Sequence, residues 1–193
     1  MSKILLLNTG LKHAQEFTNP FLKRLEVYLS KQHDCIDIRN TLTFDERTFF
    51  EYDKVIFIFM TALDSIPSST LEILQKISEQ NVKDKEVYAL ITCDEYETEK
   101  CDLSEKIMQQ WCFRFHFQYM GTIKIGSVLF IMKTPAKYVV ASQLKKFAGA
   151  VINGEKIHLR ISELTEKRFM KTANKYWDKQ IKKKKKEKAK DAI

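Results

Sequence analysis

The chain contains 193 residues with a mass of 22.7 kDa, of which 44% are hydrophobic and 30% are charged. This length and composition are typical of one globular domain with its own core, so they exclude a disordered chain and a small disulfide-stapled protein. The net charge is +8, but residues 181–193 hold seven lysines and only two acidic residues, which leaves +3 on the rest.

Apolar runs alternate with segments in which apolar residues recur every three or four positions, which predicts strands that alternate with helices. In chain order we expect a strand at 3–8, a helix over 17–29, a strand at 35–38, a short helix within 41–51, a strand at 55–60, a helix over 68–78, a strand at 87–91, a helix over 102–117, a strand within 119–132, a helix over 135–151 and a last helix over 162–190. In the helical segments, Phe44, Phe49, Phe50, Leu71 and Leu103 are expected to face the core.

This alternation predicts βαβ units and a mostly parallel sheet. We therefore expect an α/β protein with a flavodoxin-like, doubly wound, five-stranded parallel sheet and helices on both faces, plus a C-terminal helix. Residues 1–180 are expected to form a single domain, followed by a lysine-rich tail at residues 181–193.

No segment of the sequence predicts export or membrane insertion. The longest apolar run, residues 55–60, is far shorter than the about 18 residues that a membrane-spanning helix needs. Lys3 is followed by only four apolar residues and by no small-residue cleavage site, so the N-terminus does not resemble a secretory signal. A cytoplasmic location is the expectation.

Ligands of open parallel sheets bind beyond the carboxyl ends of the strands, where loops 8–19, 60–67, 92–97 and 119–127 are expected to lie. The first loop leads into a helix, whose free N–H groups and positive dipole end favour an anion. The residues that could assist there are Asn8, Thr9 and Thr18 as donors, with Lys12 or His13 as the positive charge. The alternative is an ordinary turn capped by Thr18, since Gly10 is the loop's only glycine and Glu16 would oppose a phosphate.

No residue is predicted to be catalytic and no metal site is predicted. The chain lacks a G-x-S-x-G motif, and His33, His116 and His158 have no partner that the sequence reveals. An acidic segment follows the fourth strand, and we interpret it as solvated loop residues: Asp94, Glu95, Glu97 and Glu99. The cysteines have neither zinc-site nor disulfide spacing, so reduced and packed thiols are expected at Cys35, Cys93, Cys101 and Cys112.

The lysine run of the tail contains no interleaved aromatic residues, so it lacks the stacking surfaces of single-strand binding proteins. A solvated helix end is the favoured interpretation, and nucleic acid is not an expected partner. Electrostatic association with nucleic acid or anionic lipid is the alternative.

Four segments together suggest a family. Residues 55–67 (VIFIFMTALDSIP) parallel an apolar strand followed by P-L-Y-x-D-S-L-P, and residues 87–97 (VYALITCDEYE) parallel V-Y-A-I-x-N-C-G-F-Y-E. Residues 121–126 correspond to a glycine-rich segment, and residues 168–180 to a C-terminal R-F-x-Y-K and W-x-x-Q. On these segments the chain resembles bacterial flavodoxin-like NAD(P)H-dependent FMN oxidoreductases.

The resemblance implies that a hydride passes from NAD(P)H through bound FMN to an acceptor, either a small molecule or a quinone-like compound. Homodimers are common in such proteins. By resemblance, Thr9, Lys12 and Thr18 would hold the phosphate. The full set of cofactor-binding residues implied is Asn8, Thr9, Gly10, Lys12, Thr18, Thr61, Ala62, Leu63, Asp64, Thr92, Cys93, Asp94, Tyr96 and Gly121.

The sequence departs from the family pattern in these same loops. The G-S-P-R opening is replaced by residues 9–12 (TGLK), and a proline and a ring-stacking tyrosine by Met60 and Ala62. A glycine and a phenylalanine are replaced by Asp94 and Glu95, which add bulk and negative charge beside the flavin ring. The alternative function is therefore a non-catalytic flavodoxin-like domain with an eroded flavin site, acting as a binding or interaction module.

Overall fold

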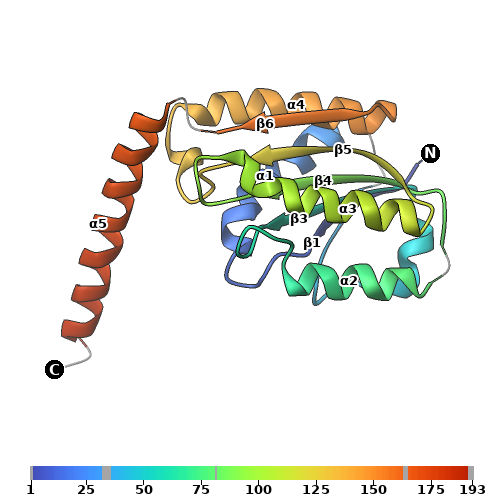
Figure 1. The fold of residues 1–193 in the computed structure, drawn as a ribbon, viewed down its shortest axis with the longest axis horizontal. Helices are drawn as coiled ribbons and strands as arrows, with labels where there is room; N and C mark the ends of the chain where they lie inside the picture. Colours follow the sequence, from blue (N-terminus) through green and yellow to red (C-terminus); the bar gives the residue numbers. More distant parts are fainter. Residues whose placement is uncertain (1, 32–35, 81, 163–164, 191–193) are drawn as a thin grey trace.

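The central feature of the fold is a six-stranded parallel sheet (Figure 1). The computed structural model describes residues 2–31, 36–80, 82–162 and 165–190. The strands are β1 (Ile4–Asn8), β2 (Ile36–Asn40), β3 (Lys54–Met60), β4 (Glu86–Thr92), β5 (Gln118–Ile125) and β6 (Ile157–Ile161), in the spatial order β2-β1-β3-β4-β5-β6. The expected flavodoxin-like α/β class is confirmed.

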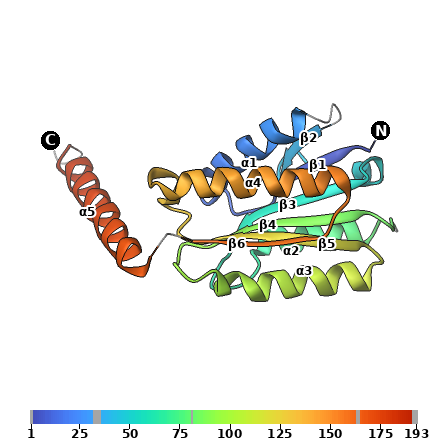
Figure 2. The same ribbon diagram turned by 90° about the horizontal axis from the view of Figure 1, so that it is seen from above.

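Helices cover both faces of the sheet (Figure 2). The α-helices are α1 (Gln15–Ser30), α2 (Ser68–Ser78), α3 (Asp102–Arg114), α4 (Ala136–Asn153) and α5 (Glu166–Lys190), and the short 3-10 helices are η1 (Glu46–Glu51), η2 (Thr98–Cys101) and η3 (Ile131–Lys133). One face packs against α1 and α4, and the other against η1, α2 and α3. Successive residues of a strand point to opposite faces, so Leu6 joins one core and Leu5 the other.

Helix α5 lies outside the two helical layers and beyond the carboxyl edge of the sheet (Figures 1 and 2). It is continuous from Glu166 to Lys190 and therefore crosses the expected boundary between residues 180 and 181. Aromatic rings fix its first turns to the body, since Phe169 lies 5.7 Å from Tyr96 and 5.5 Å from Phe130 between ring centroids. Within the described ranges, none of the helices is both long and apolar enough to cross a membrane.

The sixth strand was not expected. In β6 the side chains of Ile157 and Ile161 are buried while His158 is exposed, the alternation of an edge strand rather than of a fully buried one. β6 approaches β5 so closely that a Cβ on Gly121 would lie 1.8 Å from the Ile157 carbonyl oxygen. Gly121 also has a φ of +146°, which side-chain-bearing residues rarely adopt. The sheet therefore needs glycine at this position.

A buried ion-pair network joins β5 and β6 to α3. The Lys124 side chain is 5% exposed and its Nζ contacts Asp102 Oδ1 at 2.5 Å and Glu105 Oε2. His158 Nδ1, which the sequence left without a partner, lies 3.1 Å from Glu105 Oε1. Burial opposes ionisation of Glu105, but the hydrogen bond and charge of Lys124 hold its pKa below the usual value. A buried charge is tolerated only when it is paired in this way.

Three expectations about individual side chains were wrong. Phe44 and Phe49 are buried as expected, but Phe50 is 64% exposed because η1 is a tighter 3-10 helix that turns it outward. Leu71 and Leu103 are also exposed, since the outer sides of α2 and α3 face solvent.

The thiols of Cys93, Cys101 and Cys112 are free and buried, as expected. Hydrogen bonding to Cys93 and burial raise the pKa of Cys101, and burial raises the pKa of Cys112. Cys35, the fourth cysteine, lies outside the described residues.

The close approach at Gly121 leads to a stability prediction. Gly121→Ala should lower the free energy of unfolding by roughly 2–4 kcal/mol, because its Cβ must displace the β6 backbone and adopt a disfavoured φ. Gly149→Ala is the matched control: nothing lies within 4 Å of its Cβ, and alanine should stabilise α4 by about 0.5–1 kcal/mol. Urea unfolding of both variants tests this. Equal effects would contradict the assigned β5–β6 contact.

Candidate functional site

The loops that follow β1, β3, β4 and β5 meet at one edge of the sheet because these strands are parallel and in register. The expected loop at 119–127 was wrong in extent, since residues 119–125 belong to β5. Met60 of β3 is paired with Thr92 of β4, which is paired in turn with Ile125 of β5. The pairing continues into the loops: the Thr61 N–H donates to the Thr92 carbonyl at 2.8 Å, and the Cys93 N–H to the Ile125 carbonyl at 3.0 Å. The loops therefore begin at a common level, which is the edge where this class of sheet binds ligands.

The first loop presents a row of unused backbone donors. The N–H groups of residues 10–13 have no hydrogen-bond partner among the residues that the structure describes. They immediately precede α1, so they lie at the positive end of its dipole. Lys12 and His13 are exposed beside them. This arrangement favours an anion such as phosphate.

Most polar groups of the first loop already form hydrogen bonds within the protein. The Thr9 carbonyl accepts hydrogen bonds from Ser69 (2.6 Å) and Thr70 (3.2 Å), and the Thr70 hydroxyl lies 2.9 Å from that of Thr9. Asn8 Nδ2 donates to the Thr18 hydroxyl at 3.0 Å. Thr18 lies inside α1 and so does not cap it.

The first loop also contains a buried hydrogen-bond acceptor that has no partner among the described residues. Asn8 is 2% exposed, and its Oδ1 atom has no partner within the described chain. A Cβ on Gly10 would lie 3.6 Å from this oxygen and 3.6 Å from the Phe59 Cα, which are ordinary contact distances, so the space at Gly10 does not require glycine. An unpaired buried acceptor is costly, which makes Asn8 a candidate for contact with a ligand donor.

The second loop holds an apolar side chain in solvent. Ala62 and Ser65 exchange two backbone hydrogen bonds of 2.8 and 3.0 Å around Leu63 and Asp64, whose φ angles are 49° and 60°. Such tight turns usually contain Asn and Gly, because left-handed backbone is unfavourable for other residues. Leu63 is nevertheless completely exposed, and Lys100 Nζ fixes Asp64 at 2.7 Å. Strained backbone clusters at functional sites, which makes this turn a candidate for ligand contact.

The third loop places two carboxyl groups at the same edge. Asp94 is exposed, whereas one oxygen of Glu95 is buried without a partner in the described part of the chain. Burial and the adjacent Asp94 carboxyl raise the pKa of Glu95. The loop is held down by the Ser127 N–H, which donates to the Glu95 carbonyl at 2.7 Å.

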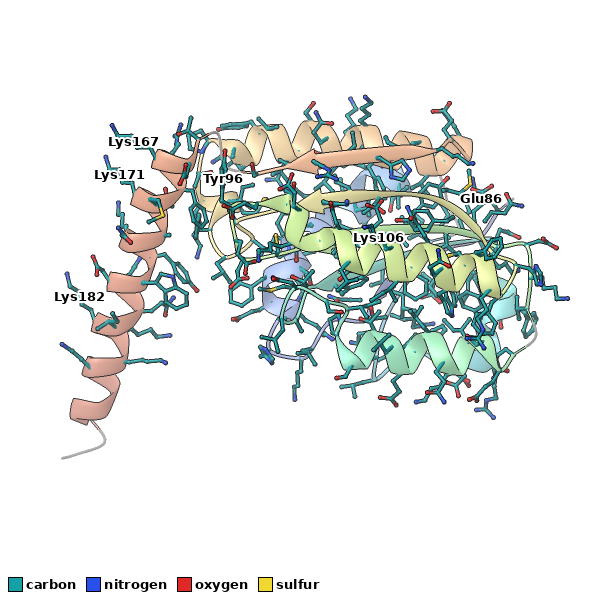
Figure 3. All side chains as sticks on the ribbon, in the orientation of Figure 1. Glu86, Tyr96, Lys106, Lys167, Lys171 and Lys182 are labelled. Atoms are coloured by element: carbon teal, nitrogen blue, oxygen red, sulfur yellow. The ribbon has the colours of Figure 1, made fainter. Side chains whose placement is uncertain are left out.

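The remaining residues of this loop anchor it. Thr92 and Cys93 are buried, and Cys93 Sγ lies 3.6 Å from the Glu97 carbonyl oxygen. Tyr96 lies at the edge nearest α5 (Figure 3), where it contacts Phe169. Gly126 packs against the loop so tightly that a Cβ there would approach the Tyr96 carbonyl to 2.8 Å.

The structure brings the expected residues of the first three loops to this edge but not Gly121. Gly121 precedes the end of β5 by four residues, about 13 Å along the strand, and contacts β6. The residues gathered at the edge are Asn8, Thr9, Gly10, Lys12, Thr18, Thr61, Ala62, Leu63, Asp64, Thr92, Cys93, Asp94 and Tyr96. Sequence reasoning missed Ser69, Thr70 and Lys100, which fix these loops from positions distant in the chain.

Comparison with known proteins supports the fold alone. No protein-family model matches the chain, and no curated protein matches it. Among solved structures, flavodoxin 1 from Bacillus cereus matches 79% of this chain and 98% of its own, with a TM-score of 0.62 and 12% identity. An NADH:FMN oxidoreductase in its apo form matches 82% of this chain and 95% of its own, with a TM-score of 0.60 and 11% identity.

A third similar structure is the rubredoxin oxygen:oxidoreductase of Desulfovibrio gigas, with a TM-score of 0.61 and 16% identity. The match covers 80% of this chain but only 36% of that one, so this chain corresponds to about a third of the larger protein. All three similarities confirm the flavodoxin-like fold.

The backbone of the second loop should be strained at Leu63, which has a left-handed conformation. Leu63→Gly should raise the free energy of unfolding by about 0.5–1 kcal/mol, because glycine accepts the left-handed backbone and no packing is lost. Leu42→Gly is the control, since Leu42 is 83% exposed and has no positive φ. It should instead lower stability by a similar amount. Denaturant unfolding distinguishes the two, and a loss of stability in both would refute the strain.

The raised pKa of Glu95 predicts a pH dependence. Its ionised form is disfavoured in the folded state, so Glu95 costs stability at neutral pH, and this cost disappears as pH falls through the folded-state pKa. Glu95→Gln should therefore be more stable than the wild type at pH 7, with the difference vanishing near pH 4. The exposed Glu97 supplies the control substitution Glu97→Gln. A pH-independent difference would contradict this assignment.

Proposed function

We propose that the chain is an FMN-binding, flavodoxin-like oxidoreductase that uses NAD(P)H as electron donor. The observation that carries this proposal is the row of unpaired N–H groups at residues 10–13, directly before α1 at the carboxyl edge of a flavodoxin-like sheet. A phosphate at a helix start is stabilised by such donors and by the dipole. The similar solved structures include a flavodoxin and a protein named as an NADH:FMN oxidoreductase, which supports flavin as the ligand.

The residues present fit FMN. The N–H groups of residues 10–13 and Lys12 would hold the phosphate, and the buried Asn8 Oδ1 would accept a hydrogen bond from a ribityl hydroxyl. Leu63 and Tyr96, on the second and third loops, would contact the ring. When bound, FMN supplies the ability to accept a hydride from NAD(P)H and to pass electrons to an acceptor. The protein contributes binding and orientation, and we propose a small-molecule or quinone-like acceptor.

The second candidate is a non-catalytic interaction module, favoured by a specific observation. Asp94 is exposed at the edge that would receive the ring, and the Thr9 and Thr18 hydroxyls are already bonded within the protein. A carboxylate there opposes an anionic reduced flavin. Under either function we propose a homodimer, a cytoplasmic location and a division into a domain at residues 1–180 and a tail at residues 181–193.

Titration of the purified protein with FMN tests the proposal. We expect quenching of flavin fluorescence at micromolar FMN and perturbed visible bands. Lys12→Ala should weaken binding about tenfold, because a charge-assisted phosphate contact is lost. Lys23→Ala is the matched control, since Lys23 is exposed on the same helix but away from its start. No quenching at tens of micromolar FMN would refute the oxidoreductase.

A double variant tests whether the edge of the sheet holds flavin at all. Ala62→Tyr combined with Asp94→Gly should raise FMN affinity at least fivefold, since an aromatic stack adds about 1 kcal/mol and a negative charge is removed. If the double variant binds no FMN either, the edge of the sheet does not hold flavin and the interaction module is the better assignment.

A further inference from the structure

The net positive charge of the protein comes from α5. Residues 166–190 contain twelve Lys or Arg and three Asp or Glu, a net of +9, which leaves 21 basic and 22 acidic residues elsewhere, a net of −1. The flavodoxin that matches this chain is covered over 98% of its length, while 79% of this chain is covered, so about a fifth of this chain has no counterpart there. The charge balance therefore makes α5 a strongly basic element on a nearly neutral body.

A cavity of about 950 Å³ lies between α5 and the segment that joins η3 to α4. Seven Lys or Arg side chains line it, and no acidic residue does among the described residues. They include Lys133 from η3 and Lys179 and Lys183 from α5. Thr134 and Pro135, at the positive end of the α4 dipole, complete the wall. We call this cavity the α5 groove.

The composition of the α5 groove favours a ligand with several negative charges and an aromatic base. Like charges that line one cavity repel each other, and a polyanion relieves that repulsion. The volume is within the range of small-molecule sites. Phe130 and Tyr176 form part of the wall with ring centroids 6.2 Å apart, and Lys133 Nζ lies 5.6 Å from the Tyr176 ring. Such rings offer a surface on which a base can stack.

The α5 groove lies next to two loops of the candidate flavin site, the first loop before α1 and the third loop, which contains Tyr96. A second cavity of about 400 Å³ shares Lys133, Tyr176 and Lys183 with it and extends to Glu16 and Phe17, in the first turn of α1. At the other end, Phe169 of α5 contacts Tyr96 of the third loop. A ligand in the α5 groove would therefore have one end beside the loops that would hold FMN.

We propose that the α5 groove binds the adenosine half of the electron donor and selects the dinucleotide that carries an additional phosphate, NADPH, over NADH. This inference rests on the proposed function, since it assigns the donor of the same site. A groove of this size with one cluster of rings suits a single dinucleotide, whereas single-stranded nucleic acid requires stacking surfaces repeated along its path. The additional phosphate dianion is the group that the lysines of the groove distinguish.

Binding measurements with NADPH and NADH, by calorimetry at about 50 mM salt, test the assignment without any turnover. We expect NADPH to bind at least tenfold more tightly than NADH, since each charge-assisted phosphate contact is worth about tenfold. Lys179→Gln combined with Lys183→Gln should remove this preference and leave NADH binding nearly unchanged. The matched control is Lys167→Gln with Lys185→Gln, which removes the same charge from α5 at exposed residues that do not line the groove.

Three results would overturn the inference: equal affinity for the two dinucleotides, an equal loss in both double variants, or tighter binding of a fluorescent single-stranded oligonucleotide that the groove variant abolishes. The last result would assign the groove to nucleic acid. FMN titrations on the same proteins separate the two proposals. A protein that binds FMN without preferring NADPH refutes the α5 groove alone, and one that prefers NADPH without binding FMN refutes the flavin site alone.

Discussion

The register of the parallel strands is the constraint on which the rest of the molecule depends. β3, β4 and β5 end as paired neighbours at Met60, Thr92 and Ile125, and backbone hydrogen bonds carry the pairing into the loops. Buried backbone groups must be paired, so these three strands stay in the sheet up to this edge. The position of the candidate site is therefore set by the backbone, and the side chains decide only what binds there.

Most of the fold could be predicted from the sequence because its inner strands are buried on both faces. Residues 4–7, 55–59 and 87–91 are apolar without interruption, and all are buried. β6 was not predicted, because it is an edge strand in which buried and exposed residues alternate, and its sequence lacks a continuous apolar run. Its position depends on contacts that no local pattern encodes, namely the close approach to Gly121, which lacks a Cβ, and the contact of His158 with Glu105 of α3.

The candidate site was less predictable because its geometry arises between distant segments. The rule for parallel sheets predicted which edge holds the loops, and the position of α1 after the first loop predicted N–H groups that favour an anion there. The sequence could not reveal that Thr70 pairs with the Thr9 hydroxyl or that Lys100 fixes Asp64, since these partners are 61 and 36 residues apart. Nor does a Leu-Asp pair suggest a left-handed turn, which the surrounding loop imposes on Leu63 and Asp64.

The reactivity of three buried thiols can be used to measure how often part of the core opens. Cys93, Cys101 and Cys112 lie in the core on the α2 and α3 side of the sheet, and the raised pKa values of Cys101 and Cys112 keep those two groups protonated. The thiolate is the reactive form, so alkylating reagents can modify these residues only when that half of the core separates. Their labelling rate therefore measures how often the layer that supports the second and third loops opens under native conditions.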